Sequence, residues 1–142
     1  MTVAKQYFDH RAGVGNVGSY QASAQPYLSS SIDIPSDNTV VKISLPNVTR
    51  FITIKNSGPD GSNEVDMRVG FSQNGVNGAE NNNWVILSNQ ESYSADWRVK
   101  EVYMRVSPTG GSLNATASIV AGLTSIDAKE LFHNWSGSQG VG

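Results

Sequence analysis

The stretch from Arg98 to Ile126 shows the clearest alternation of apolar and polar positions in the chain. One side of its first half, in extended form, carries Lys100, Val102, Met104 and Val106. The opposite side carries Val99, Glu101, Tyr103 and Arg105. Beyond the turn-forming residues 107–111, one face carries Ala115, Ala117, Ile119 and Ala121. A period of two is typical of strands with one buried face. The pattern predicts two strands joined by a tight reversal, which we expect to be the nucleus of the domain.

Shorter alternating runs precede this pair, and clusters of Pro, Gly, Asn and Asp separate them. They predict strands at Leu28–Ile34, Thr39–Leu45, Val48–Asn56, Val65–Ser72, Trp84–Leu87 and Gln90–Trp97. We expect Trp84–Leu87 to be a short buried strand and Gln90–Trp97 to be a polar edge segment. No helical period precedes residue 125. About eight short strands with polar connections favour an all-β fold, as an antiparallel two-sheet sandwich or a jelly roll.

The N-terminal part of the chain breaks this pattern. Residues 1–27 show neither a helical stripe nor strand alternation, yet they carry four spaced aromatic residues, Tyr7, Phe8, Tyr20 and Tyr27. A flexible leader with incidental tyrosines is one interpretation. The other is an extended arm that becomes ordered against a neighbouring subunit, with the aromatic rings as anchors.

We therefore predict three parts: an extended N-terminal arm over residues 1–27, a β domain over 28–126, and a short helix with a flexible tail over 127–142. The helix is predicted at Asp127–Trp135, where Asp127 can cap its first turn. Leu131, Phe132 and Trp135 would form its apolar stripe. We expect Phe132 and Trp135 to join the aromatic residues of the arm as interface residues.

Composition narrows the classes of function. The 142 residues correspond to one domain by length. Charged residues make up 15% of the chain, below the roughly 25% usual for globular domains. Removing neutral polar groups from water costs less free energy than removing charged groups. A surface of this kind therefore suits contact with other proteins or with sugars. A formal net charge of -2 offers no basic footprint for nucleic acid, and the lack of cysteine excludes disulfides.

The pattern also predicts a protein that is soluble when made. No apolar run approaches the roughly 18 residues of a membrane span. The first fifteen residues lack the apolar core of a secretory signal peptide. We therefore expect no membrane span and no signal peptide.

No motif in the sequence predicts an enzyme, a metal site or a bound cofactor. Residues 13–18 spell G-x-G-x-x-G, but no strand precedes them and no helical stripe follows, as a dinucleotide site requires. The acidic and amide residues of the turn at 57–66 lack the spacing of a calcium loop. Nothing in the pattern brings the two histidines, His10 and His133, together.

A carbohydrate- or receptor-binding β-sandwich is the alternative that the residues leave open. Exposed aromatic rings can stack on sugars, and the pattern leaves Tyr93 and Trp135 free for this role. The loops at 57–64 and 73–83 would add polar contacts, and we expect the second, with its two Asn-Gly pairs, to be an exposed loop. The possible ligand-contact residues are Asp60, Asn63, Asn74, Asn77 and Tyr93.

Five segments between Thr39 and Ile126 carry a family resemblance. They are FITIKN, DMRVGFSQNGV, the strand with Trp84, WRVKEVYMRV and SIVAGLTSI. Together they resemble the single jelly-roll capsid proteins of icosahedral double-stranded DNA viruses and phages, which include penton and minor virion proteins. The resemblance implies a two-sheet single jelly roll of about eight strands. It supplies no functional residues that carry over one by one.

The resemblance also implies a structural role in the virion. The chain would be a penton or vertex protein, or a minor capsid or decoration protein, made in the host cytoplasm. Its expected partners are copies of itself, as a homopentamer or other homo-oligomer, and neighbouring capsid proteins. We expect no direct contact with nucleic acid.

Overall fold

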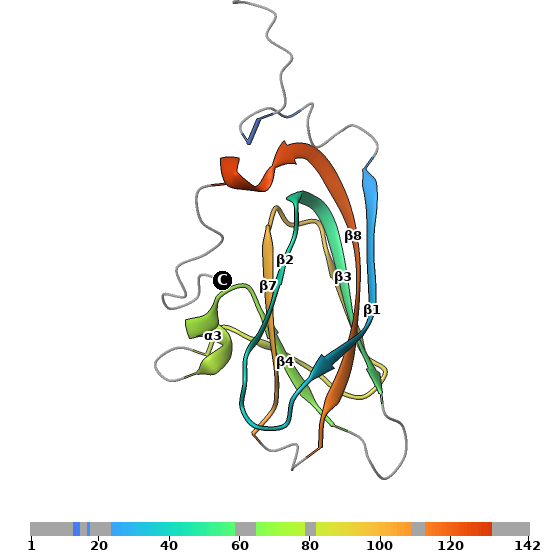
Figure 1. Ribbon diagram of the computed structural model, residues 1–142, viewed down its shortest axis with the longest axis vertical. Helices are drawn as coiled ribbons and strands as arrows, with labels where there is room; N and C mark the ends of the chain where they lie inside the picture. Colours follow the sequence, from blue (N-terminus) through green and yellow to red (C-terminus); the bar gives the residue numbers. More distant parts are fainter. Residues whose placement is uncertain are drawn as a thin grey trace, which may run out of the picture.

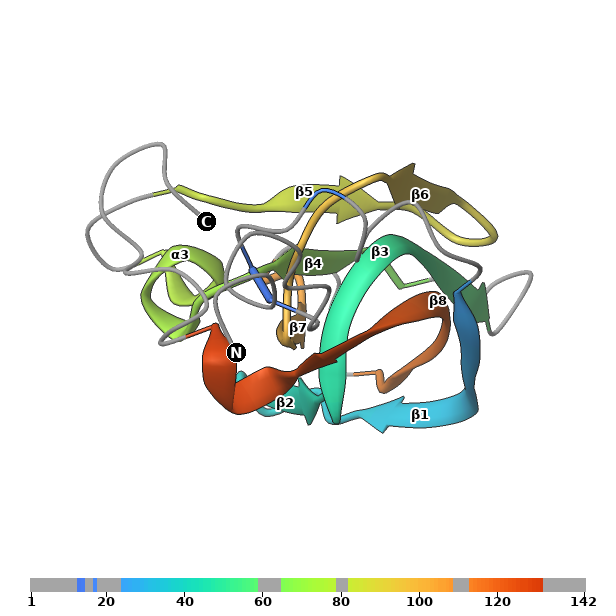
Figure 2. The ribbon, with the colours of Figure 1, turned by 90° about the horizontal axis from the view of Figure 1, so that it is seen from above.

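The computed structural model describes residues 13–14, 17, 24–58, 65–78, 82–108 and 113–131. Within these residues, eight strands form two four-stranded antiparallel sheets that pack face to face (Figure 1). In the view from above, β5 and β6 lie along one side of the molecule, and β1 and β2 lie along the opposite side (Figure 2). None of the helices described is long and apolar enough to cross a membrane.

The two sheets differ in the length of their strands. Sheet A has the order β1 (Gln25–Ile34), β8 (Ala115–Asp127), β3 (Asn47–Gly58) and β6 (Ser92–Ala95). Sheet B has the order β2 (Val41–Ser44), β7 (Glu101–Val106), β4 (Met67–Gly70) and β5 (Val85–Leu87). The long strands β3 and β8 are neighbours in the middle of sheet A, so this sheet is the larger of the two.

The order of pairing identifies the fold as a single jelly roll. Strands pair from the ends of the chain inward, β1 with β8, β2 with β7, β3 with β6 and β4 with β5. Alternate pairs of this ribbon fall in opposite sheets, as in a jelly roll. The predicted all-β fold is confirmed. Because β1 begins at Gln25 and β8 ends at Asp127, the β domain extends slightly beyond residues 28–126 at both ends.

The predicted hairpin between the two strands of Arg98–Ile126 is wrong. β7 belongs to sheet B and β8 belongs to sheet A, so the two strands do not pair with each other. β7 pairs with β2 and β4, while β8 pairs with β1 and β3. The connection after β7 therefore crosses between the sheets. A turn signal shows that the chain changes direction, but it does not show which strand lies alongside.

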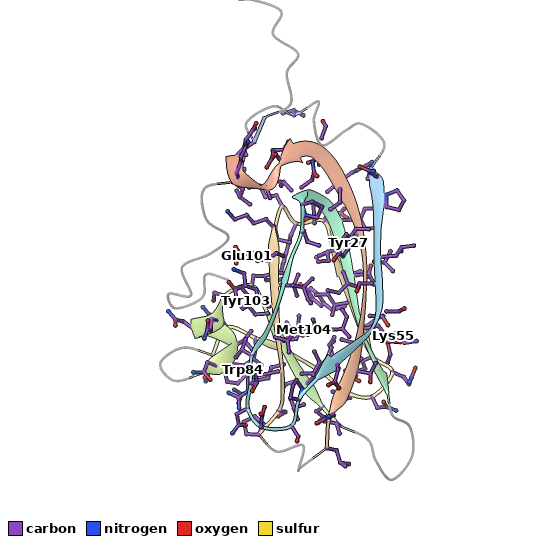
Figure 3. The ribbon with its side chains drawn as sticks, in the orientation of Figure 1. Tyr27, Lys55, Trp84, Glu101, Tyr103 and Met104 are labelled. Atoms are coloured by element: carbon purple, nitrogen blue, oxygen red, sulfur yellow. The ribbon has the colours of Figure 1, made fainter. Side chains whose placement is uncertain are left out.

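The core fills the space between the sheets, and the predicted alternation is confirmed there. Met104 points from β7 into this space, whereas Glu101 and Tyr103 lie on the outer side of the same strand (Figure 3). On β8, Ala117, Ile119 and Ala121 are buried against sheet B. On sheet B, the inward side of the segment around β4 buries Val65, Met67, Val69 and Phe71.

Asn56 on β3 links the two layers through the core. Its side chain is fully buried, and its Nδ2 donates to the carbonyl oxygens of Val65 at 2.7 Å and Leu87 at 3.0 Å. Both acceptors lie at ends of strand segments in the opposite layer. A buried amide satisfied in this way ties the two sheets together in a fixed register.

A short helix, α3 (Gln73–Asn77), occupies part of the predicted exposed loop at 73–83, so the expectation of a loop is wrong there. The Ser72 hydroxyl caps it by accepting from the Gly75 N–H at 3.1 Å. Gly78 ends it with a φ of 73°, which favours glycine. Its buried residue Val76 faces Gly70 of β4, where a Cβ would overlap the valine side chain.

The C-terminal helix is shorter in the described residues than Asp127–Trp135. A 3-10 turn, η2 (Ala128–Glu130), follows β8, and Leu131 is extended. The predicted cap is confirmed, because an Asp127 carboxylate oxygen accepts from the Lys129 N–H at 3.1 Å. Of the predicted apolar stripe, only Leu131 lies within the described residues. The rest of the predicted helix lies outside the described residues.

The prediction of a buried strand at Trp84–Leu87 is wrong for most of its length. β5 begins at Val85, and only Leu87 is buried. Val85 and Ile86 remain 40% and 39% exposed, because β5 is an edge strand of sheet B. An apolar run does not show whether its strand lies in the centre or at the edge of a sheet.

Candidate functional site

The outer face of sheet B is mostly polar, apart from exposed Ile86 on the edge strand β5, and most of its polar side chains contact one another. Tyr103 donates a hydrogen bond to the Glu101 carboxylate, and Lys42 Nζ lies 3.5 Å from the same carboxylate. Burial raises the pKa of Tyr103 to about 12, and the hydrogen bond to Glu101 adds to this rise. Tyr103 is therefore protonated at neutral pH and is a donor. These three side chains satisfy one another.

Two arginines hold α3 on this face. Arg105 is buried, and its guanidinium donates to the Asn77 backbone oxygen at 3.2 Å, to Asn77 Oδ1 at 3.0 Å and to Asn38 Oδ1 at 2.8 Å. Arg68 Nη1 donates to the carbonyl oxygens of Val76 and Asn77, each at 3.3 Å. Cations at the C-terminal carbonyls of a helix stabilise it. Arg68 and Arg105 therefore hold the C-terminal end of α3 against sheet B.

The ring of Trp84 covers the second arginine. The Arg68 guanidinium carbon lies 3.7 Å from the centroid of this ring, which is cation–π geometry. Burial lowers the pKa of Arg68, and the nearby charge of Arg105 lowers it further. The guanidinium still carries its charge at neutral pH, because arginine deprotonates only at very high pH. Trp84 therefore has a structural partner on this face.

The outer face of sheet A is different, and we call it the A face. Its central row crosses all four strands, from Leu28 through Val120 and Thr53 to Ser94. Leu28 is 71% exposed and Val120 is 42% exposed. Phe51 lies on the same face and packs over Gly122, where a Cβ would overlap its ring. The row is apolar and exposed on β1 and β8, at Leu28 and Val120, and it carries hydroxyl groups on β3 and β6.

Hydroxyl groups fill much of the rest of the A face. Thr53 and Ser94 share a hydrogen bond of 2.8 Å, and Ser57 and Ser118 share one of 2.6 Å. The charged residues on the strands of sheet A are Asp33, Arg50, Lys55 and Asp127. Sheet B carries as many on much shorter strands. The A face is therefore apolar and hydroxylic, with sparse charge.

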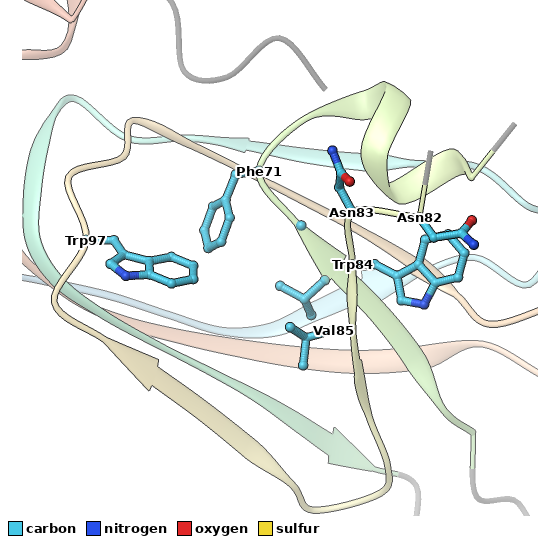
Figure 4. Close-up of a pocket in the computed structure, with 8 residues that line it drawn as sticks. Phe71, Asn82, Asn83, Trp84, Val85 and Trp97 are labelled. Carbon is cyan, nitrogen blue, oxygen red and sulfur yellow. The ribbon is translucent and has the colours of Figure 1, made fainter. Parts of the chain in front are cut away.

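A hollow of about 260 Å³ opens at the side of the sandwich where β5 and β6 form the sheet edges, and we call it the edge hollow. It is lined by Val69, Gly70, Phe71, Asn82, Asn83, Trp84, Val85 and Trp97. None of these residues is charged. Phe71, Val85 and Trp97 lie on one side of segment 82–85, while Asn82 and Trp84 project from the other side (Figure 4).

Trp97 is the exposed aromatic wall of the edge hollow. It is 44% exposed, and its ring meets Phe71 edge-on, with centroids 5.2 Å apart and planes at 70°. Tyr93 contacts it from β6 at 5.7 Å between centroids. Thr49 fixes its backbone, because the threonine hydroxyl donates to the Trp97 carbonyl oxygen and accepts from the Val99 N–H at 3.0 Å. The indole is therefore held in place from two sides.

A second hollow, of about 370 Å³, has different chemistry. Thr49, Arg50, Asp96 and Arg98 line it. Asp96 and Arg98 flank Trp97 in the sequence, so one short segment contributes to both hollows. We call this second feature the charged hollow.

The predicted site residues fall into four groups. Tyr7, Phe8, Tyr20, Asp60, Asn63, Phe132 and Trp135 lie outside the described residues. Tyr27 is part of β1, pairs with Ala121 and packs against the core. Asn74 and Asn77 are exposed on α3, and the Asn77 amide accepts from Arg105. Tyr93 is half-buried beside Trp97. The described members of the set therefore do not form one site.

Phe71 and Trp97 were not predicted as site residues, and Asn82 and Asn83 were included only as part of the loop at 73–83. Phe71 fits the inward side of the segment around β4, and only the fold shows that it lines this hollow. The Asn run at 81–83 before Trp84 is the one sequence signal for a polar rim here. Among the described residues, no group of three or more His, Asp or Glu side chains could hold a metal ion.

The chain was compared with protein-family models, with curated proteins and with solved structures, and none of these comparisons gave a match.

Proposed function

We propose that this chain is a structural virion protein, a jelly-roll capsid subunit at a penton or vertex position or in a minor capsid or decoration role. It acts through contacts with copies of itself and with neighbouring capsid proteins. The observation that carries the proposal is the A face, an exposed sheet surface with an apolar row and sparse charge. The jelly-roll strand order and the sequence resemblance support the same role.

The chemistry of the A face favours burial against another protein. Burial of Leu28, Val120 and Phe51 at an interface lowers the free energy by roughly 25 cal/mol for each Å² of apolar area that leaves water. The hydroxyls around them are satisfied in pairs, so covering them costs little. Interfaces between proteins are depleted of charge at their centres for this reason.

The predicted N-terminal arm has a defined place in the proposal. Its aromatic residues Tyr7, Phe8 and Tyr20 would anchor it on a neighbouring subunit. Tyr27 contributes to the core, so a truncation that tests the arm must stop at residue 23. We expect the truncated chain to fold and to fail to join particles.

Native mass spectrometry of the full chain over a range of concentrations tests the assembly. We expect a homopentamer or another closed homo-oligomer, because a closed ring satisfies every copy of a heterologous interface. Image averaging of particles should place this ring at five-fold vertices for a penton protein. A chain that remains monomeric at every concentration and does not enter particles would contradict the proposal.

The full chain with Tyr7→Ala, Phe8→Ala and Tyr20→Ala is the matched partner of the truncation. It keeps the length of the arm and removes its rings. If both proteins enter particles normally, the arm has no role in assembly.

A carbohydrate- or receptor-binding module is the second candidate. The edge hollow favours it, because this hollow combines exposed Trp97 with amide side chains. Tyr93, predicted as a ligand contact, lies beside that ring.

A further inference from the structure

We infer that β1 carries a built-in block against pairing with a strand of a second copy of this chain. Sheet A therefore ends at β1 and does not continue into a neighbouring molecule. The inference goes beyond the proposed function, because it concerns the edge of sheet A and not the A face. It applies whether or not the chain is part of a virion.

β1 is the one long edge strand among the described residues. Four strands lie at sheet edges there, β1 and β6 in sheet A and β2 and β5 in sheet B. β1 has 10 residues, whereas β2 and β6 have 4 each and β5 has 3. An edge strand presents unpaired N–H and C=O groups that another strand can bind, and a short strand offers few of them. Pairing between copies is therefore a hazard mainly at β1.

A β-bulge interrupts β1 near its middle. Between Ser29 and Ile32, β1 advances by three residues while its partner β8 advances by only two. Ser30 and Ser31 therefore lie opposite the single residue Ser118. Ser31 has a φ of 58°, in the left-handed region that favours glycine. A bulge bends its strand and increases the twist, so the N–H and C=O groups around it leave the line that a straight partner strand needs.

Residues on both sides of the bulge limit the edge further. Pro26 has no N–H, so it removes a donor from the first half of β1. Asp33 is exposed in the second half, and pairing would bring its charge beside the added strand. Each half of β1 therefore lacks part of what a partner strand requires.

The core does not require the bulge. Tyr27 precedes it and Ile34 follows it, and both pack against the core. If either Ser30 or Ser31 were removed, the other would lie opposite Ser118, and the remaining pairs of β1 with β8 could stay as they are. The extra residue thus affects the edge of the sheet and not the interior, although it holds a serine in a strained conformation.

A regular edge at β1 would allow open-ended growth. Pairing of β1 in one copy with β6 in the next would extend sheet A in one direction without closing a ring. Contacts of this kind lead to fibres and aggregates. By blocking them, the bulge leaves association of the chain to surfaces other than this edge.

The test compares the full chain with a variant that lacks Ser31. Both proteins also carry Val120→Lys, which places a charge on the A face and weakens association there. We expect the deletion to strengthen self-association at least about tenfold in sedimentation velocity. Amide hydrogen exchange should show new protection of those N–H groups of β1 that point away from β8.

Three further variants act as controls. Ser31→Gly keeps the extra residue and suits the left-handed conformation, so it should fold at least as stably as the parent and should not associate through β1. Deletion of Ser30 removes the same extra residue and should act like deletion of Ser31. Pro26→Val, added to the variant that lacks Ser31, should strengthen association further, because it restores an N–H to the edge.

Three outcomes overturn the inference. One is a folded variant, with either serine deleted, that neither associates more strongly nor gains protection in β1. Another is stronger association in which the newly protected amides lie outside β1. The third is failure of both deletion variants to fold, which would mean that the fold itself requires the extra residue. The role of the A face is tested separately, by comparing Val120→Lys alone with the parent.

Discussion

The outer faces of the two sheets of this jelly roll differ in what already covers them. On sheet B, α3 lies over β4 and β7, and Arg68 and Arg105 bind its last carbonyl groups. On sheet A, the apolar row from Leu28 to Val120 has no such cover among the described residues. The polar groups on the outer face of sheet B bind other groups of the same chain, whereas the A face exposes mainly neutral side chains.

In this fold, the residues that stabilise the structure and the residues available for contact with other proteins lie on different faces. The charged groups of sheet B have partners and are partly buried, so their exchange for other residues should disturb folding. The exposed residues of the A face have few internal partners, so their exchange should disturb association and leave folding nearly intact. Mutations on each face can therefore test this difference.

Removal of the buried guanidinium on sheet B should have the largest effect on folding. Arg105→Met leaves Asn77 Oδ1 and Asn38 Oδ1 without this donor, and only Arg68 still binds the last carbonyl groups of α3. We expect the free energy of unfolding to fall by about 2–3 kcal/mol, measured by urea denaturation. Arg98→Met, the same change at an exposed arginine, should stay within about 0.5 kcal/mol of the parent. Equal effects at both positions would mean that the contacts of Arg105 stabilise the fold no more than an exposed arginine does.

A charge at the centre of the A face should weaken association and spare the fold. Val120→Lys places an ammonium group between Leu28 and Thr53. We expect subunit association to weaken at least tenfold, about 1.4 kcal/mol, because the charge must be desolvated at an interface. Sedimentation velocity measures the shift. Val120→Thr keeps the branched shape without the charge and should associate like the parent. Loss of association in both variants would point to the lost apolar contact instead of the added charge.

The raised pKa of Tyr103 makes part of the stability depend on alkaline pH. Its pKa is about 12 in the folded protein against an ordinary value of 10.0, so the folded state holds this proton more tightly. The contribution is therefore complete below pH 10 and is lost as the pH rises from 10 to 12. Thermal unfolding scans across this range should show a steeper decline for the parent than for Tyr103→Phe.

At neutral pH the same substitution should cost about 0.5–1 kcal/mol, for the lost hydrogen bond to Glu101. Tyr93→Phe, a matched change on β6, should keep the decline of the parent. If Tyr103→Phe declines as steeply as the parent, other groups cause the alkaline loss.

The ion pair at the edge of sheet B should contribute least. Lys42 is half-exposed and lies 3.5 Å from the Glu101 carboxylate. We expect Lys42→Ala to change the free energy of unfolding by less than about 0.5 kcal/mol, and 1 M salt to remove the difference. A larger effect that persists in salt would mean that the lysine stem packs on the sheet.

The candidate site could be predicted only in part. Tyr93 was expected as a ligand contact because it stood apart from the apolar pattern, and it does lie beside the edge hollow. Phe71 follows β4 of sheet B and Trp97 follows β6 of sheet A, and their rings meet only because the fold brings these two segments together. Such convergence has no local signature, since neither residue is near the other in sequence.

The short helix was missed for a related reason. α3 has one buried side chain, Val76, so it is too short to produce a helical period. Its limits were nonetheless present in the sequence, as Ser72 at the start and Gly78 at the end. Caps without a periodic stripe do not distinguish one helical turn from a loop.

The amino-acid sequence by itself determined which segments are strands and which side chains face inward. Alternation is a local property, because successive side chains of an extended chain point to opposite sides, so Val102, Met104 and Ile119 could be assigned to the core without knowing their neighbours. Only the tertiary structure decided that β7 and β8 lie in opposite sheets and that Leu28 pairs with Val120. Those pairings depend on contacts between distant segments, which form only when the whole ribbon rolls up and buries both inner faces at once.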